Sequence, residues 1–187
     1  MKAAFLDRDG VINKEINYLH RIEDFEFTDR CIEGLKQLQI LGYQLIVITN
    51  QAGIARGYYT EKQYQILTRW MVNILREQGI ELLDVLHCPH HPNGTIKELA
   101  IDCDCRKPKP GMMLEAKSRH AIDLGSSIII GDKLSDIEAG AFAGIPQKFL
   151  VKTGHQLPQE ISKDTNIFDN LADVANYLTS QSSHNSF

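Results

Sequence analysis

Five short apolar runs divide the chain, and each has the length of a β-strand rather than that of a helix. Their apolar residues are mostly continuous instead of alternating with polar ones, which is typical of strands covered on both faces. We therefore expect strands at Ala3–Leu6, Tyr43–Ile48, Leu82–Leu86, Ser127–Ile130 and Gln147–Val151.

Segments with helical periodicity separate these runs. Thr60-Glu61-Lys62-Gln63 and Ser135-Asp136-Ile137-Glu138 have the capping-box pattern that predicts a helix start. Glycines at 42 and 79 follow two of the periodic segments and predict where those helices stop. We expect helices over Asp29–Leu41, Glu61–Gln78, Pro110–Gly125, Ser135–Ala143 and Leu171–Leu178.

Strands that alternate with helices predict an α/β fold, a Rossmann-like parallel sheet with helices on both faces. The 187 residues suit a single domain, 1–187, large enough to bury about 70% of its surface. Residues 179–187 are polar, and we expect this tail to be disordered.

Composition and charge narrow the class of protein. With 43% hydrophobic and 24% charged residues, the chain is globular rather than disordered. Apolar runs such as Leu45–Ile48 are far shorter than the roughly 20 residues of a membrane-spanning helix. A net charge of −4 argues against nucleic acid as a partner. The N-terminus lacks a secretory signal, so we expect a cytoplasmic protein with reduced cysteines.

Polar side chains follow three of the predicted strands. Asp7 and Asp9 come after the first strand, Thr49 ends the second, and Asp132 follows the fourth. The carboxyl ends of parallel strands meet at one edge of the sheet, so these side chains should lie together. Two carboxylates on one side repel each other unless a cation lies between them, and oxygen ligands suit Mg²⁺. Alone, Asp-x-Asp-Gly could also be an ordinary turn, with Gly10 at positive φ.

A second cluster lies between the third strand and the next helix. Cys88-x-His90 and Cys103-x-Cys105 offer three thiolates and one imidazole, a ligand set that suits a structural zinc ion. A disulfide or unligated thiols are the alternatives, and His91 rivals His90 as the ligand. Without such a staple, the loop of about 88–107 would be unusually long for a compact domain.

These elements resemble a known family. Asp7, Asp9, Thr49, Lys107 and Asp132 have the order of the haloacid-dehalogenase (HAD) phosphohydrolase superfamily. The resemblance covers about residues 2–153. The segments Thr49–Gly57, Cys88–Pro92, Cys103–Met112 and Gly131–Asp136 are similar to those of the D-glycero-D-manno-heptose-1,7-bisphosphate 7-phosphatases.

The resemblance implies a mechanism through an aspartyl-phosphate intermediate. Asp7 would be the nucleophile and Asp9 the general acid and base. Thr49 and Lys107 would stabilise the transferring phosphoryl group. Catalytic Mg²⁺ would be held by Asp7, the Asp9 backbone carbonyl and Asp132.

The resemblance also implies ligands for zinc and contacts for the substrate. Zn²⁺ would be a structural ion bound by Cys88, His90, Cys103 and Cys105. No large cap domain is inserted, so short loops must bind the substrate, and Arg106 with Lys133 would bind its second phosphate. The implied substrate-binding residues are Glu15, Ile16, Asn17, Tyr18, Asn50, Gln51, Ala52, Arg56, Arg106 and Lys133.

The implied activity is removal of the 7-phosphate of heptose 1,7-bisphosphate, with the β anomer favoured, in ADP-heptose and lipopolysaccharide core synthesis. Histidinol-phosphate phosphatase is the alternative, although its cationic substrate would favour acidic loops over Lys133. A polynucleotide 3′-phosphatase would need a basic stripe. A zinc-stapled binding module with an inactive site would have lost the catalytic set, and all five residues are present. We expect a sugar phosphate as the partner and a monomer that binds no membrane.

Overall fold

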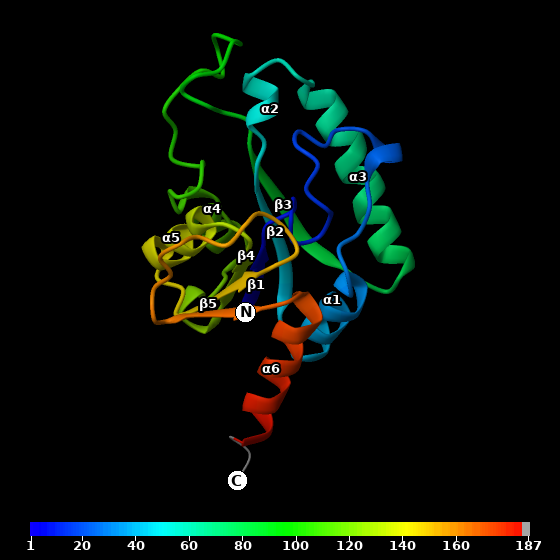
Figure 1. Cartoon of the computed structure of the whole chain (residues 1–187), viewed down its shortest axis with the longest axis vertical. Helices are drawn as coiled ribbons and strands as arrows, with labels where there is room; N and C mark the ends of the chain where they lie inside the picture. The colour runs from blue at the N-terminus through cyan, green and yellow to red at the C-terminus, as the bar shows by residue number, and fades with distance from the viewer. Residues whose placement is uncertain (185–187) are drawn as a thin grey trace.

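The computed structural model describes residues 1–184, and its strands form one six-stranded sheet in which all neighbours are parallel (Figure 1). The sheet has the order β3-β2-β1-β4-β5-β6. The predicted α/β class and parallel sheet are confirmed. The strands are β1 (Ala3–Leu6), β2 (Gln44–Asn50), β3 (Leu82–Cys88), β4 (Ile128–Gly131), β5 (Gln147–Val151) and β6 (Thr165–Phe168).

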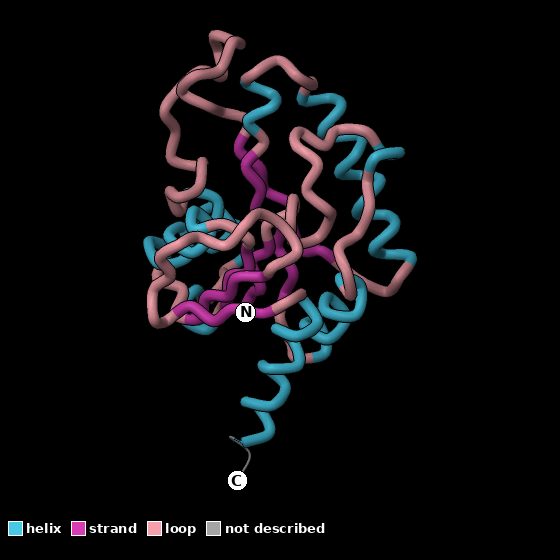
Figure 2. The backbone as a smooth tube through the Cα atoms, in the orientation of Figure 1, coloured by secondary structure: helices cyan, strands magenta, loops and turns pink. Residues whose placement is uncertain are grey.

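Helices cover both faces of this sheet (Figures 1 and 2). Helices α1, α3 and α6 pack on one face, and α4 and α5 pack on the other. The helices are α1 (Cys31–Ile40), α2 (Ala52–Ala55), α3 (Glu61–Glu77), α4 (Gly111–His120), α5 (Leu134–Ala143) and α6 (Leu171–His184), with short 3-10 turns η1 (Ile22–Asp24) and η2 (Leu124–Ser126).

The central strand β1 explains why the apolar runs are continuous. Ala4 and Leu6 point into the core beneath α1 and α6, whereas Ala3 and Phe5 point into the core beneath α4. All four side chains are fully buried. Successive side chains of a strand face opposite sides, so a sheet covered twice needs apolar residues at every position.

Helices α4 and α5 differ from their predicted bounds. Helix α4 ends at His120 instead of Gly125, because Ala121 adopts the left-handed conformation at φ 53°. Helix α5 begins at Leu134, and Ser135 is not its cap. The Asp136 carboxylate accepts hydrogen bonds from the N–H groups of Asp132 and Lys133, so this aspartate caps the helix.

The predicted end of α6 at Leu178 is also wrong, because the helix continues to His184. The Thr179 hydroxyl donates to the Ala175 carbonyl at 2.9 Å and accepts from Gln37 on α1 at 3.1 Å. These hydrogen bonds stabilise the polar C-terminal part of α6, for which the sequence predicted disorder. Residues 185–187 of the predicted tail lie outside the described residues.

Strand β6 was not predicted. Its four residues Thr165–Phe168 lie at the sheet edge, where Asn166 and Ile167 are exposed, and this polar segment lacks the apolar run of a buried strand. Between β1 and α1 the chain carries only the 3-10 turn η1, so no cap domain is inserted there. None of the described helices combines the length and the apolar character needed to cross a bilayer.

Candidate active site

A cavity of about 490 Å³ opens where β1, β2 and β4 end. The loop between β3 and α4 lines part of it through His91, Arg106, Lys107 and Pro108. Of the predicted catalytic, magnesium-binding and substrate-binding residues, Ile16, Thr49 and Asp132 are not on its wall, and the four predicted zinc ligands also lie off it. The predicted residues that line it are Asp7, Asp9, Glu15, Asn17, Tyr18, Asn50, Gln51, Ala52, Arg56, Arg106, Lys107 and Lys133.

Three buried carboxylates meet at the floor of this cavity. Asp7 follows β1, Asp132 follows β4, and Asp136 lies in the first turn of α5, with one oxygen of each within 4.8 Å of the others. Burial raises the pKa of Asp7 well above its usual range; Asp136 and Asp132 add to this, and Lys107 opposes it. Asp132 Oδ1 is buried without a hydrogen-bond partner. Clustered carboxylates with an unpartnered oxygen fit a hard cation such as Mg²⁺.

Lys107 neutralises part of this charge. Its Nζ lies 3.0 Å from Asp7 Oδ1 and 2.6 Å from Asp136 Oδ1, and it donates to the Ile48 carbonyl at 2.9 Å. Burial lowers the pKa of Lys107, but the two carboxylates outweigh that effect and the net pKa is raised. Asn50 forms two 3.0 Å hydrogen bonds with the Lys107 backbone, so its amide positions this lysine.

Asp9 has a different environment, in which hydrogen-bond donors surround the carboxylate. Arg8 donates to Oδ1 from Nη2 at 2.8 Å and from Nε at 3.2 Å. Asn13 donates to the same oxygen at 3.0 Å, and Gln51 donates to Oδ2 at 3.0 Å. Burial opposes ionisation, but these donors outweigh it and hold the pKa of Asp9 below its usual range.

Gln51 links Asp9 to the second strand. Its amide nitrogen also donates to Thr49 Oγ1 at 2.8 Å, and its oxygen accepts a 2.5 Å hydrogen bond from Tyr59. Thr49 is fully buried. The Gln51 side chain therefore orients Asp9 and Thr49, and its predicted contact with substrate stays a prediction.

The Asp132 carboxylate packs closely between Gly10 and Gly154. A Cβ at Gly10, where φ is 89°, would lie 2.3 Å from Asp132 Oδ2, and a Cβ at Gly154 would lie 2.1 Å from it. His155 holds the same oxygen through its backbone N–H at 2.8 Å and its ring Nδ1 at 2.6 Å. Only glycine at both positions leaves room for the carboxylate.

The Cys/His cluster forms at the base of the loop between β3 and α4. The sulfur of Cys105 lies 3.0 Å from that of Cys88, 3.4 Å from that of Cys103 and 3.3 Å from His90 Nδ1. These sulfurs are too far apart for a disulfide, which needs about 2.05 Å. The contact with Cys88, and then those with His90 and Cys103, lower the pKa of Cys105 to about 5, whereas the same contact with Cys105 raises the pKa of Cys88. The thiolate form, favoured at Cys105, is the one that binds metals.

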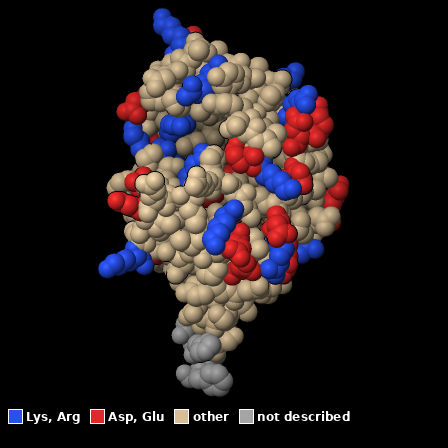
Figure 3. Space-filling view, viewed as in Figure 1, with Lys and Arg blue, Asp and Glu red and all other residues tan. Residues whose placement is uncertain are grey.

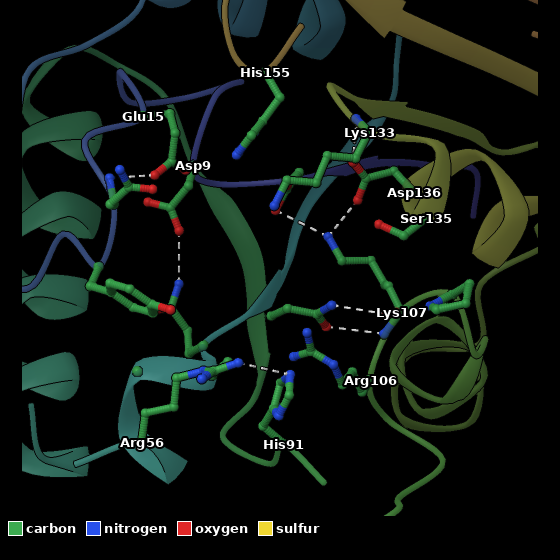
Figure 4. Close-up of a pocket in the computed structure, with 18 of the residues that line it drawn as sticks. Asp9, Glu15, Arg56, His91, Arg106, Lys107, Lys133, Ser135, Asp136 and His155 are labelled. Carbon is green, nitrogen blue, oxygen red and sulfur yellow. Dashed lines mark hydrogen bonds and ion pairs between the residues drawn. The ribbon is translucent and has the colours of Figure 1, made fainter. Parts of the chain in front are cut away.

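His91 lies outside this cluster and on the cavity wall. Burial, Arg106 and Arg56 lower its pKa. Figure 4 shows these three residues gathered at one end of the cavity, with Asp9, Lys133 and His155 drawn toward the other. Lys and Arg side chains rim a hollow in the upper part of the face in Figure 3.

The predicted substrate loop follows β1 and lines the cavity through Glu15, Asn17 and Tyr18. The Glu15 carboxylate accepts a hydrogen bond from the Asn17 N–H at 2.6 Å, and both Asn17 and Tyr18 have positive φ. The Tyr18 ring packs on Tyr58 at 4.5 Å between centroids. Ile16 is exposed and does not line the cavity.

The sequence predicted no active-site role for Arg8, Asp136 or His155, and it indicated His91 only as an alternative zinc ligand. A signal existed for Asp136, which lies four residues after Asp132 at the start of a predicted helix. None existed for His155, because it meets Asp132 only when distant loops fold together. Arg8 directly precedes Asp9, but its place in the sequence does not show that the guanidinium folds back onto that carboxylate.

Comparison with known proteins defines the class first. The profile of the HAD-hydrolase-like family matches residues 104–177. A HAD-like phosphatase from Mesorhizobium loti superposes with a TM-score of 0.84 at 34% identity, covering 96% of this chain and 87% of its own. The chain is therefore a phosphatase of the HAD class.

The relatives then define the family. A D-glycero-α-D-manno-heptose-1,7-bisphosphate 7-phosphatase from Photorhabdus laumondii is 64% identical over 83% of this chain and 85% of its own. The β-anomer enzyme of Salmonella typhi is 43% identical over 96% of both chains. The D,D-heptose 1,7-bisphosphate phosphatase of B. bronchiseptica, solved with magnesium and phosphate, superposes with a TM-score of 0.82 at 29% identity, covering 97% of this chain and 99% of its own. The chain belongs to the heptose-1,7-bisphosphate 7-phosphatase family.

Proposed function

We propose that this enzyme hydrolyses the 7-phosphate of D-glycero-α-D-manno-heptose 1,7-bisphosphate. The observation that carries the proposal is one cavity with a carboxylate cluster at its floor and cationic side chains at its rim. A substrate with two phosphates needs both features, because one phosphate reacts and the other must be held.

We propose the α anomer, whereas the sequence favoured the β anomer. The 64% identical relative is named for the α anomer, whereas relatives at 42–46% identity are named for the β anomer. The greater similarity supports the same anomer for this chain.

In the first chemical step, a carboxylate oxygen of Asp7 attacks phosphorus and the bond from phosphorus to the sugar oxygen breaks. Asp9 gives its proton to the leaving alkoxide, which is otherwise a poor leaving group. Lys107, already at 3.0 Å from Asp7, is placed to stabilise the phosphoryl oxygens, with the buried Thr49 hydroxyl nearby. The products are the alcohol and phosphorylated Asp7.

In the second step, water attacks the phosphorus of phosphorylated Asp7. Asp9, now ionised, takes a proton from that water, the bond from phosphorus to Asp7 breaks, and phosphate leaves. Asp9 thereby regains the proton that it gave in the first step. The donors around Asp9 suit this step, because they stabilise its ionised form.

Two metal ions complete the proposal. Mg²⁺ held by Asp7, Asp132 and the Asp9 carbonyl would neutralise charge between the nucleophile and the phosphate. The Asp136 carboxylate lies beside Asp7 and Asp132 and pairs with Lys107 at 2.6 Å, so it would add negative charge next to the ion. Zn²⁺ bound by Cys88, His90, Cys103 and Cys105 would hold the loop that carries Arg106 and Lys107.

Phosphate release from the two anomers and from histidinol phosphate tests the proposal. With Mg²⁺ present, we expect the highest kcat/KM for the α anomer, a lower value for the β anomer and little release from histidinol phosphate. Preference for histidinol phosphate would overturn it. The expectation of a cytoplasmic monomer stays a prediction, and light scattering tests its oligomeric part.

A further inference from the structure

One end of the cavity holds hydrogen-bond donors that lack a matching acceptor. Arg56 follows α2, and His91 lies in the loop that follows β3. Arg56 Nη2 and His91 Nε2 face each other at 3.4 Å. Arg106 lies beside them in Figure 4, with Nη1 at 3.5 Å from the His90 carbonyl. These side chains all line the cavity that holds Asp7 and Asp9.

The backbone fixes the tautomer of His91. The Asn93 N–H donates to His91 Nδ1 at 3.0 Å, so this nitrogen presents a lone pair. A neutral imidazole then carries its proton on Nε2, and a guanidinium has no acceptor at all. Arg56 and His91 therefore aim two donors at each other, and their contact is not a hydrogen bond.

A role in docking the loop does not explain this contact. The N–H groups of Thr95 and Ile96 both donate to the Ala55 carbonyl, at 2.8 and 2.9 Å, and already attach the loop to α2. Arg56 Nε is also buried with no hydrogen-bond partner among the described residues. A buried donor is costly to leave unpaired, so an acceptor within reach of Arg56 Nε and of the half-exposed His91 would be bound favourably.

We infer that His91 donates its Nε2–H to the phosphate that stays on the sugar, in a site completed by Arg56 and Arg106. The inference rests on the proposed function, since it needs a substrate with two phosphates. Phosphate offers only acceptors, and guanidinium groups suit its geometry. His91 directly follows the metal-cluster residue His90, so the metal loop also places this donor.

A comparison of two substrates tests this specificity role. We expect His91→Ala to lower kcat/KM about 10- to 100-fold for heptose 1,7-bisphosphate, as for a hydrogen bond to a charged group. For heptose 7-phosphate, which lacks the second phosphate, the change should stay below about threefold. His91→Gln should recover most of the loss, because its amide N–H can replace Nε2–H. Lys97→Ala, in the same loop but exposed and outside the cavity, is the matched control and should match wild type on both substrates.

Zinc content is measured for every variant, because loss of zinc would lower both activities together. Equal losses on the two substrates in a zinc-loaded His91→Ala protein would overturn the inference. Failure of His91→Gln to recover the bisphosphate activity would also contradict it.

A measurement on the wild-type protein does not depend on turnover. Nitrogen-15 NMR of the zinc-loaded full chain should find the His91 proton on Nε2, and mannose 1-phosphate should shift that resonance. A proton on Nδ1, or no shift with mannose 1-phosphate at saturation, would overturn the inference. Wild type could shift the His91 resonance with mannose 1-phosphate and yet release no phosphate from heptose 1,7-bisphosphate. In that case the proposed function is wrong, but His91 still belongs to an anion-binding site.

Discussion

Asp7 and Asp9 are two residues apart, yet their surroundings shift their pKa values in opposite directions. Burial and neighbouring carboxylates raise the pKa of Asp7, whereas Arg8, Asn13 and Gln51 lower that of Asp9 despite its burial. A cation in the carboxylate cluster would return Asp7 to its ionised, nucleophilic form. An anionic phosphate beside Asp9 would favour the protonated form that the first step needs. The bound cation and phosphate would thus bring Asp7 and Asp9 to the protonation states that the first step needs.

The first prediction concerns Asp7→Asn. We expect this variant to lose more than about 99% of the phosphatase activity, because an amide cannot attack phosphorus. The amide has nearly the size of the carboxylate, so the far-UV circular dichroism spectrum should match that of wild type. A folded variant that keeps more than about a hundredth of the rate would rule out Asp7 as the nucleophile.

The second prediction separates the roles of Asp9 from those of Asp7. Asp9→Asn should slow hydrolysis of heptose bisphosphate by about 100-fold or more, as expected for loss of a general acid. An aryl phosphate has a good leaving group, so phosphorylation of Asp7 from that substrate should be slowed much less. Rapid-quench kinetics with both substrates makes the comparison. Equal slowing of the phosphorylation step would contradict an acid role.

At the scale of elements, a single carboxylate joins β3 to the end of α4. Asp84 on β3 lies 2.7 Å from His120 Nε2 and 3.0 Å from Arg119 Nη1, and both partners lie in the last turn of the helix. Burial raises the pKa of Asp84, but His120, the Val85 N–H and Arg119 outweigh that effect, so the pKa is lowered.

This lowered pKa predicts how the stability changes with pH. A carboxylate with a lower pKa in the folded state stabilises the fold above its unfolded pKa of about 4. That stabilisation is lost as the pH falls through the lower, folded value. Asp84→Asn should therefore reduce the free energy of unfolding by about 1 kcal/mol at pH 7 and by much less near pH 3.

Urea unfolding of wild type and variant across this pH range measures the difference. Asp29→Asn replaces an exposed carboxylate ahead of α1 and is the control. Its free energy of unfolding should match that of wild type both at pH 7 and near pH 3. A difference between wild type and Asp84→Asn that stays constant with pH would contradict the account.

The bounds of elements show where sequence patterns stop being informative. The Thr60 capping box was predicted and is formed, with the Thr60 hydroxyl accepting from the Gln63 N–H at 3.1 Å. The same pattern at Ser135 failed, because Asp136 caps α5 through its own carboxylate. A local pattern decides a helix start only when no nearby side chain competes for the same N–H groups.

At the scale of the whole molecule, the fold was predictable because continuous apolar strands and intervening helices repeat along the chain. The polar tips at Asp7, Thr49 and Asp132 could be placed together because parallel strands end at one edge. The roles of Arg8 and His155 could not be predicted. His155 meets Asp132 only through tertiary folding, and the Arg8 guanidinium is held beside Asp9 by the distant Leu19 carbonyl.

The metal loop leads to a prediction for the whole molecule. Cys103→Ser should lower the zinc content, the melting temperature and the phosphatase activity together, because the loop carries Arg106 and Lys107. Metal analysis, calorimetry and phosphate release make the three measurements. Cys31→Ala, which alters a buried thiol of α1 far from the loop in sequence, should lose stability but keep its zinc. Full activity in a zinc-free protein would contradict a role for the loop in positioning these cations.

The central claim is that Asp7 carries the phosphoryl group from heptose bisphosphate. Acid quench of the enzyme during turnover with Mg²⁺, followed by mass spectrometry of its peptides, tests it most directly. We expect a phosphoryl group on the peptide that contains Asp7, in wild type and not in Asp7→Asn. Phosphate release from an enzyme that never carries this group, under quench conditions that preserve acyl phosphates, would contradict it.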